Sequence, residues 1–259
     1  MHKFLIIPQI NDLDESCALA KEYGFGFEFN DFFTPAALDD TKRTEELIGI
    51  YKARGLPDIC TNHGDFFDVL IFSDDPKIRE ISELRVRQSM EVSLKLGAKG
   101  VVFHTNHTPF FTSSKVYTDN WLRRNHDFWH KILDEYPQTE IYMENMCDFS
   151  PELPAQLAES LKEHKNFGIC LDYAHASIFG DTDMEIWVKT LAPYIKHIHI
   201  NDNDLKNDLH LAVGDGKINW ERFAEYYFEY FADKTVLIET SSTEKQRRSA
   251  EYLRKIGII

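Results

Sequence analysis

Short apolar runs alternate with longer amphipathic stretches along the whole 259-residue sequence, and this alternation constrains the fold more than any other feature. Most of the apolar runs are almost continuously hydrophobic, as in FLII, GVVF and VLI. Such runs are typical of parallel strands that are covered on both faces. The pattern predicts eight strands, at residues 4–7, 25–29, 58–61, 100–104, 140–144, 167–172, 195–201 and 235–239.

The amphipathic stretches between these strands predict helices at residues 75–96, 121–136, 151–164, 220–231 and 243–255. The clearest is 75–96, where Pro76 follows an Asp cap and the apolar residues recur on one face. Eight strand–helix units in about 250 residues predict an α/β protein with a single (β/α)8 TIM barrel over residues 1–259. An open doubly wound sheet is disfavoured, because neither GxGxxG nor GxxxxGK[ST] follows the first strand.

The composition of the chain narrows the classes of partner that it can bind. The chain has 43 acidic and 29 basic residues, a formal charge of −14, which argues against broad contact with DNA or an anionic membrane. No apolar run approaches the roughly 18 residues of a membrane span, and the start of the chain is interpreted as a strand instead of a signal peptide. The four cysteines, Cys17, Cys60, Cys147 and Cys170, lack CxxC spacing and predict reduced, buried thiols in a cytoplasmic protein.

Metal-ligating side chains recur where the predicted strands end. In chain order they are His63 just after the third strand, His104, Glu144 and Asp172 at the ends of the next three, His175 three residues later, His199 in the seventh strand, Asp208 and His210 in the loop after it, and Glu239 at the end of the eighth. Barrel active sites are built at this end of the strands.

Each of these residues alone has an ordinary structural explanation, such as a helix cap or a hydrogen-bonded histidine. Together, however, they would bury four carboxylates, which costs several kcal/mol per ion unless positive charge lies among them. Few lysines or arginines are close in sequence, and mixed imidazole and carboxylate ligands suit zinc, manganese or iron. The sequence therefore predicts a site for a divalent metal, Zn²⁺ or Mn²⁺, with room for more than one ion.

Other histidines and aromatic residues are assigned smaller roles. His197 shares a strand face with His199 and is expected either to point inward or to pack. We expect His107 to border the pocket, and His126, His130 and His164 to be solvated or capping residues on helices. Aromatic residues in the same rim loops are expected to supply apolar walls for a sugar-sized pocket; they are Phe66, Phe67, Phe110, Phe111 and Tyr173.

The ordered series NHGDF, VVFHTNH, MEN, LDYAH, HIHIND, DLHLAVGDGKINW and IET resembles the xylose isomerase-like TIM-barrel superfamily, which groups sugar isomerases and epimerases with the AP endonuclease called endonuclease IV. In the sugar enzymes, the resemblance implies one metal held by Glu144, Asp172, His199 and Glu239. In endonuclease IV the site is trinuclear, and its further ligands correspond to His63, His104, His175, Asp208 and His210, all present here. Related barrels often dimerise, so the resemblance also allows a homo-oligomer.

Two reactions follow from this resemblance. The favoured one is isomerisation or epimerisation of a sugar or sugar phosphate through a metal-stabilised enediolate, with Glu144 and Glu239 exchanging protons. His175 or Lys217 is expected to assist by steering an oxygen or a phosphate. The alternative is phosphodiester hydrolysis at an abasic site with a multinuclear zinc centre, which the number of ligands favours. The rim segments FSDDPK, NHTPFFTSSK and NDNDLKND are poor in the basic residues that a nucleic-acid partner requires. A metal-stabilised binding module is the third hypothesis, although structural zinc sites close with four ligands.

Overall fold

The computed structural model describes residues 3–259, whose strands form a closed parallel barrel in sequence order. The strands are β1 (Lys3–Ile6), β2 (Gly26–Phe29), β3 (Cys60–His63), β4 (Gly100–His104), β5 (Glu140–Glu144), β6 (Phe167–Asp172), β7 (Ile195–Ile200) and β8 (Thr235–Ile238). Pairing of β1 with β8, in register from Lys3 opposite Thr235 to Ile6 opposite Ile238, closes the ring. The prediction of a (β/α)8 barrel is thereby confirmed.

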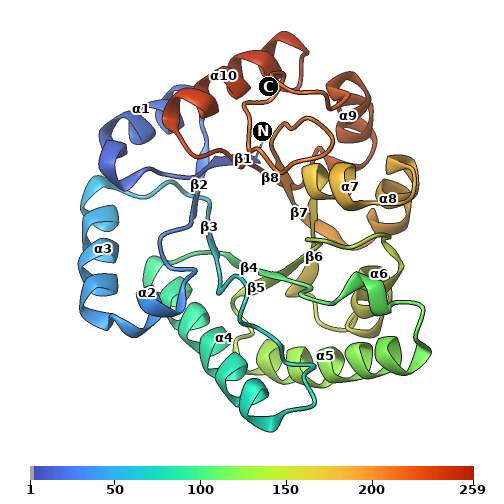
Figure 1. Cartoon of the computed structure of the whole chain (residues 1–259). Coiled ribbons are helices and arrows are strands. Elements are labelled where there is room, and N and C mark those ends of the chain that lie inside the picture. Colours follow the sequence, from blue (N-terminus) through green and yellow to red (C-terminus); the bar gives the residue numbers. More distant parts are fainter. Residues whose placement is uncertain (1–2) are drawn as a thin grey trace.

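Helices surround the barrel, as the view along its axis shows (Figure 1). They are α1 (Leu13–Tyr23), α2 (Pro35–Asp39), α3 (Thr41–Arg54), α4 (Pro76–Leu96), α5 (Lys115–Glu135), α6 (Glu152–Ser160), α7 (Tyr173–Phe179), α8 (Met184–Leu191), α9 (Trp220–Tyr226), which continues as a π-helical turn at Tyr227–Phe231, and α10 (Thr243–Lys255). Single 3₁₀ turns lie at Ile10–Asp12 and Pro109–Phe111. No helix within residues 3–259 is long and apolar enough to cross a membrane.

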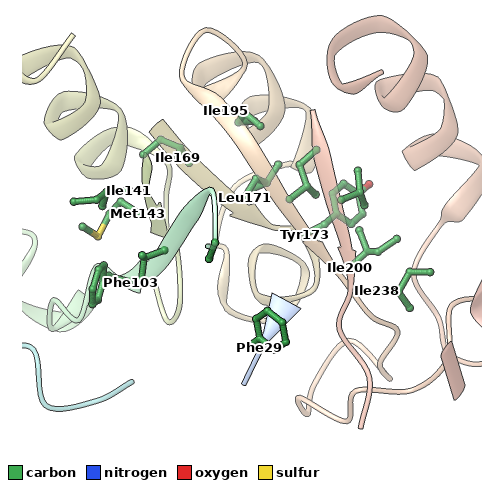
Figure 2. Packing of buried hydrophobic residues seen from close by; sticks show 14 of the residues in the cluster. Phe29, Phe103, Ile141, Met143, Ile169, Leu171, Tyr173, Ile195, Ile200 and Ile238 are labelled. Atoms are coloured by element: carbon green, nitrogen blue, oxygen red, sulfur yellow. The ribbon is translucent and has the colours of Figure 1, made fainter. Parts of the chain in front are cut away.

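Strand residues alternate between two environments. Outward side chains such as Phe103, Met143 and Leu171 pack against the surrounding helices in one large core (Figure 2). The residues between them point into the barrel, where Tyr142 and Cys170 belong to a second, much smaller apolar cluster. Because the inward-facing positions are few and close together, polar groups placed there near the strand ends must meet one another.

The boundaries of several predicted elements were wrong. The helix predicted at residues 151–164 spans Glu152–Ser160, and the third strand and α5 also differ clearly. The third strand begins and ends two residues later than predicted, because Thr61 and His63 pair with β4 opposite Gly100 and Val102. His63 is consequently the last residue of β3 and not a loop residue. Helix α5 begins six residues before the predicted start, where the Ser114 side chain accepts a hydrogen bond from the backbone N–H of Tyr117.

The cysteines are unpaired within residues 3–259. Cys60 and Cys170 are buried, as predicted, whereas Cys17 and Cys147 are only half-buried. Burial raises the pKa of the Cys60 thiol to about 11, which keeps it protonated at neutral pH.

Candidate metal centre

Glu144, the last residue of β5, lies at the centre of the polar cluster. Its Oε2 atom is 3.5 Å from His63 Nε2 and 3.4 Å from His104 Nε2. Its Oε1 atom is 3.4 Å from His199 Nδ1 and 3.5 Å from His175 Nδ1. One carboxylate therefore faces four imidazoles that come from four different strand ends.

Asp172 and Glu239 complete the buried part of the cluster. Asp172 Oδ2 is 3.3 Å from His175 Nδ1, and Glu239 Oε2 is 3.7 Å from His199 Nδ1. The other oxygen of Asp172 accepts a hydrogen bond from the backbone N–H of His175, so Asp172 is also the N-cap of α7. This cap starts a helix directly after β6 and brings His175 into the barrel mouth.

Asp208 and His210 form the outer edge of the same cluster. Asp208 Oδ2 is 3.4 Å from His175 Nε2 and 3.1 Å from His210 Nε2. The side chains of Asp208 and His210 are 30% and 32% exposed, so this edge faces the solvent. The structure thus brings together all nine side chains that the sequence singled out.

Hydrogen bonds fix which nitrogen of each ring faces the cluster. The Nδ1 atoms of His63, His175 and His210 lie 3.0, 3.1 and 3.0 Å from the backbone oxygens of Gly64, Asn145 and Glu239. An Nδ1–H that donates to a carbonyl leaves the Nε2 lone pair free, and metal-binding histidines are oriented in this way. His63 is therefore positioned to offer Nε2 on the side of Glu144, and His175 and His210 are positioned to offer Nε2 on the side of Asp208.

Several buried atoms of the cluster have no hydrogen-bond partner within residues 3–259. They are His63 Nε2, both nitrogens of His104 and of His199, Glu144 Oε2 and Asp172 Oδ2. Three overlapping groups have ligand atoms within 4.8 Å of one another: His63 with His104 and Glu144; Glu144 with Asp172 and His175; and Asp172 with His199 and Glu239. Buried polar atoms without partners are costly, and a cation among them would satisfy them. The donor set fits a borderline divalent ion.

The pKa shifts of Asp172 and His199 indicate that the cluster favours positive charge. Burial raises the pKa of Asp172 to about 8, with Glu239 and Glu144 adding to the rise and His175 opposing it. Burial lowers the pKa of His199, but nearby negative groups, Glu144 and Glu28 among them, hold it well above its ordinary value. Both shifts favour the protonated form, whereas burial lowers the pKa of His104 and favours its neutral form.

Glu28 and His197 are two interior residues that sequence reasoning missed or left open. Glu28 is fully buried on β2, and its Oε1 atom lies 3.1 Å from His199 Nε2. Its Oε2 atom lies 3.0 Å from His197 Nε2 and accepts a hydrogen bond of 2.7 Å from Thr61 Oγ1. The His197 ring points inward and stacks on Tyr142, with 5.2 Å between ring centroids. The charge of Glu28 therefore lies beside His199 Nε2, which favours the ring orientation that turns Nδ1 toward Glu144.

A signal for Glu28 does exist in the sequence. The run FGFEF contains a single charged residue, Glu28, in an otherwise apolar strand. Because side chains alternate along a strand, Glu28 shares one face of the strand with Gly26. A carboxylate in a strand buried on both faces needs a buried partner, and an inward-pointing histidine is the natural candidate.

We expect Glu28→Gln to weaken metal binding by about 10–100-fold, because the loss of a carboxylate that orients a ligand histidine typically has this effect. The amide would place an NH₂ group against either His199 or the His197–Thr61 pair, so one of them would lose its acceptor. Equilibrium dialysis against Zn²⁺ measures the affinity. Thr61→Val, which keeps the carboxylate and removes one hydrogen bond to it, is the graded control. Unchanged affinity in a folded Glu28→Gln protein would contradict the role.

A second buried carboxylate organises the long loop that carries Asp208 and His210. Asp202 Oδ2 accepts hydrogen bonds from the backbone N–H groups of Gly214 (3.0 Å) and Gly216 (2.9 Å), and from Trp220 Nε1 (2.7 Å). Asp202 Oδ1 accepts from the N–H of Ile218 at 3.1 Å. One side chain thus fixes the end of the loop that follows β7, by hydrogen bonds to residues 214–220.

Asp202→Asn is expected to destabilise the protein and to loosen the outer edge of the site. Either amide orientation turns an NH₂ group toward buried donors, and each donor left unpaired costs about 1–3 kcal/mol. Urea unfolding measures the loss of stability. Asp204→Asn in the same loop is the control, because asparagine can replace the turn contacts that Asp204 makes with Lys206 and Asn207. Equal stability of the two variants would contradict this role of Asp202.

The aromatic residues of the rim divide into walls, solvent-exposed rings and core. The Phe66 ring lies 4.2 Å from that of His104, and Phe33, which sequence reasoning missed, lies 5.4 Å from Phe66. The rings of Phe67, Phe110 and Phe111 are largely exposed, and Tyr173 packs in the core against Trp220 and Phe223. His107 is buried, with Nε2 3.4 Å from Asp148.

The fold and the site together define a TIM-barrel protein that carries its polar groups at the carboxyl ends of the strands. More particularly, the chain belongs to the xylose isomerase-like TIM barrel family, whose model matches residues 17–256.

Relatives of the chain have been found by sequence and by structure. Two uncharacterized proteins of Methanocaldococcus jannaschii are each 28% identical to it; the matches cover 74% and 76% of this chain and 68% and 76% of the relatives. A D-tagatose 3-epimerase-like protein superposes with a TM-score of 0.77 at 23% identity, covering 98% of this chain and 96% of its own. A Thermus thermophilus protein soaked with ZnCl₂ gives 0.70 at 22% identity, covering 99% and 98%. The 3-keto-D-glucoside 4-epimerase of E. coli gives 0.69 at 20% identity, covering 98% and 100%. These structures share the fold of this chain.

Proposed function

We propose that the protein is a divalent-metal-dependent isomerase or epimerase of a sugar or sugar phosphate. The observation that carries this proposal is that Glu144 and Glu239, from strands on different sides of the mouth, both face the same nitrogen of His199, at 3.4 and 3.7 Å. Two carboxylates around one position are what proton removal and return on neighbouring carbons requires.

Glu144, Asp172, His199 and Glu239 would hold the ion, which when bound would polarise the substrate's carbonyl and hydroxyl oxygens. One glutamate then removes a proton from the carbon beside the carbonyl, and the other returns a proton, so that the face of return sets the stereochemistry. His175, held between Asn145 and Asp208, would orient a substrate oxygen. The Phe33–Phe66 pair supplies an apolar wall beside these groups.

The scarcity of cations at the mouth supports a small substrate over a nucleic acid. Lys245, near His210, has its ammonium group engaged by the backbone oxygen of His210 at 2.9 Å. A polyanionic strand needs several free Lys or Arg contacts to its phosphates. The epimerases among the structures that share this fold are consistent with the choice of reaction.

A second candidate, metal-dependent phosphodiester hydrolysis, is favoured by one specific observation. The cluster holds more ligand groups than one ion requires: beyond the four residues above, His63 and His104 face Glu144, and Asp208 lies between His175 and His210. Two or three ions could activate water and neutralise both oxygens of a displaced phosphate.

Two measurements distinguish these functions. The first is the metal content of protein purified without chelator, combined with NMR in D₂O of ketoses incubated with it; solvent deuterium incorporation and ketose interconversion are expected. The second is incubation with duplex DNA that contains an abasic site. Strand cleavage that EDTA abolishes, without any deuterium incorporation, would overturn the isomerase proposal in favour of the hydrolase.

A further inference from the structure

We propose a second metal site on the outside of the barrel, in which His130 and His164 bind a divalent transition metal ion and Asp134 orients both rings. The distribution of histidines first points to it. Of the ten histidines within residues 3–259, seven lie in the barrel interior or in the mouth loops. The other three lie close together: His126 and His130 on α5, and His164 between α6 and β6.

Two of these rings already point ring nitrogens at each other. His164 Nε2 is 2.6 Å from His130 Nδ1, and the rings are nearly perpendicular, at 78°. Either ring can donate an N–H to the lone pair of the other, so the two rings are hydrogen-bonded. A metal ion that replaced this proton would meet one lone pair from each ring.

Asp134 lies beside the outer nitrogens of both rings. Its Oδ2 atom lies 3.7 Å from the outer nitrogen of His130, Nε2, and its Oδ1 atom lies 3.8 Å from the outer nitrogen of His164, Nδ1. An ion bound between the inner nitrogens would leave the N–H groups on the outer nitrogens, where the carboxylate attracts them. Ligand histidines are commonly held by a carboxylate in this way.

A transition metal fits between the inner nitrogens after a small movement. Imidazole suits zinc, copper and nickel, and two nitrogens bound to one tetrahedral zinc ion lie about 3.3 Å apart. The rings must therefore separate by less than about 1 Å. The His130 and Asp134 side chains are 54% and 65% exposed, so they are free to adjust, and water can complete the coordination.

His126 stays outside this pair. Its ring lies nearly parallel to that of His130, at 16° and 5.9 Å, so their in-plane lone pairs do not converge. Its Nδ1 atom is 3.2 Å from Ser160 Oγ. His164 lies just before β6 (Phe167–Asp172) begins, so the bound ion would tie α5 to the turn that enters β6, at the end of the barrel opposite the mouth.

Equilibrium dialysis of the full chain against Zn²⁺, with ions counted per chain, tests the site. We expect the wild type to bind one ion more than His130→Gln or His164→Gln. Asp134→Asn should keep that ion with about 10–100-fold weaker affinity. The matched control, His126→Gln, should retain the wild-type count, because it removes an imidazole from the same patch without touching the pair.

Equal ion counts and equal affinities in the wild type and both histidine variants would overturn the proposal and leave an ordinary hydrogen bond between the rings. Because these residues lie on the outside of the barrel, away from the mouth, this result would be independent of the proposed function.

Discussion

The Glu144→Gln variant is expected to fold and to lose metal affinity by more than the roughly 100-fold that loss of an outer carboxylate causes, because Glu144 would be a direct ligand. Its two oxygens face His63, His104, His175 and His199. Burial on its own raises the pKa of Glu144, but the charges of His199 and His104 hold it well below its usual range, so the side chain is an anion. An amide in its place removes that charge and puts an NH₂ group among groups that would bind a cation.

Metal analysis of purified protein and circular dichroism check this expectation. The matched control is Glu140→Gln, at the other end of the same strand, where Glu140 pairs with Lys196 at 3.0 Å and with Lys99 at 3.2 Å instead of with imidazoles. That control should bind as many ions as the wild type. A Glu144→Gln protein with the wild-type metal content would show that Glu144 is not a ligand, and the proposed site would then be wrong.

The Glu239→Gln variant is expected to keep the fold and to lose solvent proton exchange by about 10²–10⁴-fold, the usual contribution of a general acid–base residue. Glu239 follows β8 directly, and its side chain approaches His199 Nδ1 at 3.7 Å and His210 Nδ1 at 3.9 Å. The amide retains the shape of the side chain but cannot accept a proton from carbon.

Deuterium incorporation into a ketose that the wild type converts, followed by NMR in D₂O, measures this effect. Glu244→Gln is a suitable control, because this exposed acid lies in the first turn of α10, only five residues along the chain. Metal content should be determined in parallel, since loss of the ion would also stop exchange. Retained exchange in a Glu239→Gln protein would mean that the acid–base assignment is wrong.

Strand-end positions are the part of the site that sequence reasoning could predict. Parallel strands bring their carboxyl ends to one mouth, so a histidine or carboxylate at the end of a strand can be placed without knowing any contact. His104, Glu144 and Asp172 illustrate this, because each is the last residue of its strand in both prediction and structure. Glu239 was predicted as the last residue of its strand and lies one residue beyond β8.

Residues that act through other residues were harder to predict. Glu28 contacts His199 across the barrel, and the two lie 171 positions apart in sequence. Asp202 accepts hydrogen bonds from backbone N–H groups of Gly214 and Ile218, which come close to it only when the loop has folded. Tyr173 follows a rim residue directly, yet the helix that starts at Asp172 turns it into the core. Such contacts depend on tertiary geometry, which neither periodicity nor spacing encodes.

Pairing between the first and last strands has a consequence for biosynthesis. Because β1 bonds to β8, the ring cannot close while Thr235–Ile238 is still inside the ribosome. Glu239 emerges later still, so a nascent chain exposes His63, His104 and Glu144 before their last partner arrives. Until β8 pairs with β1, the sheet therefore keeps two open edges, and unpaired strand edges favour aggregation.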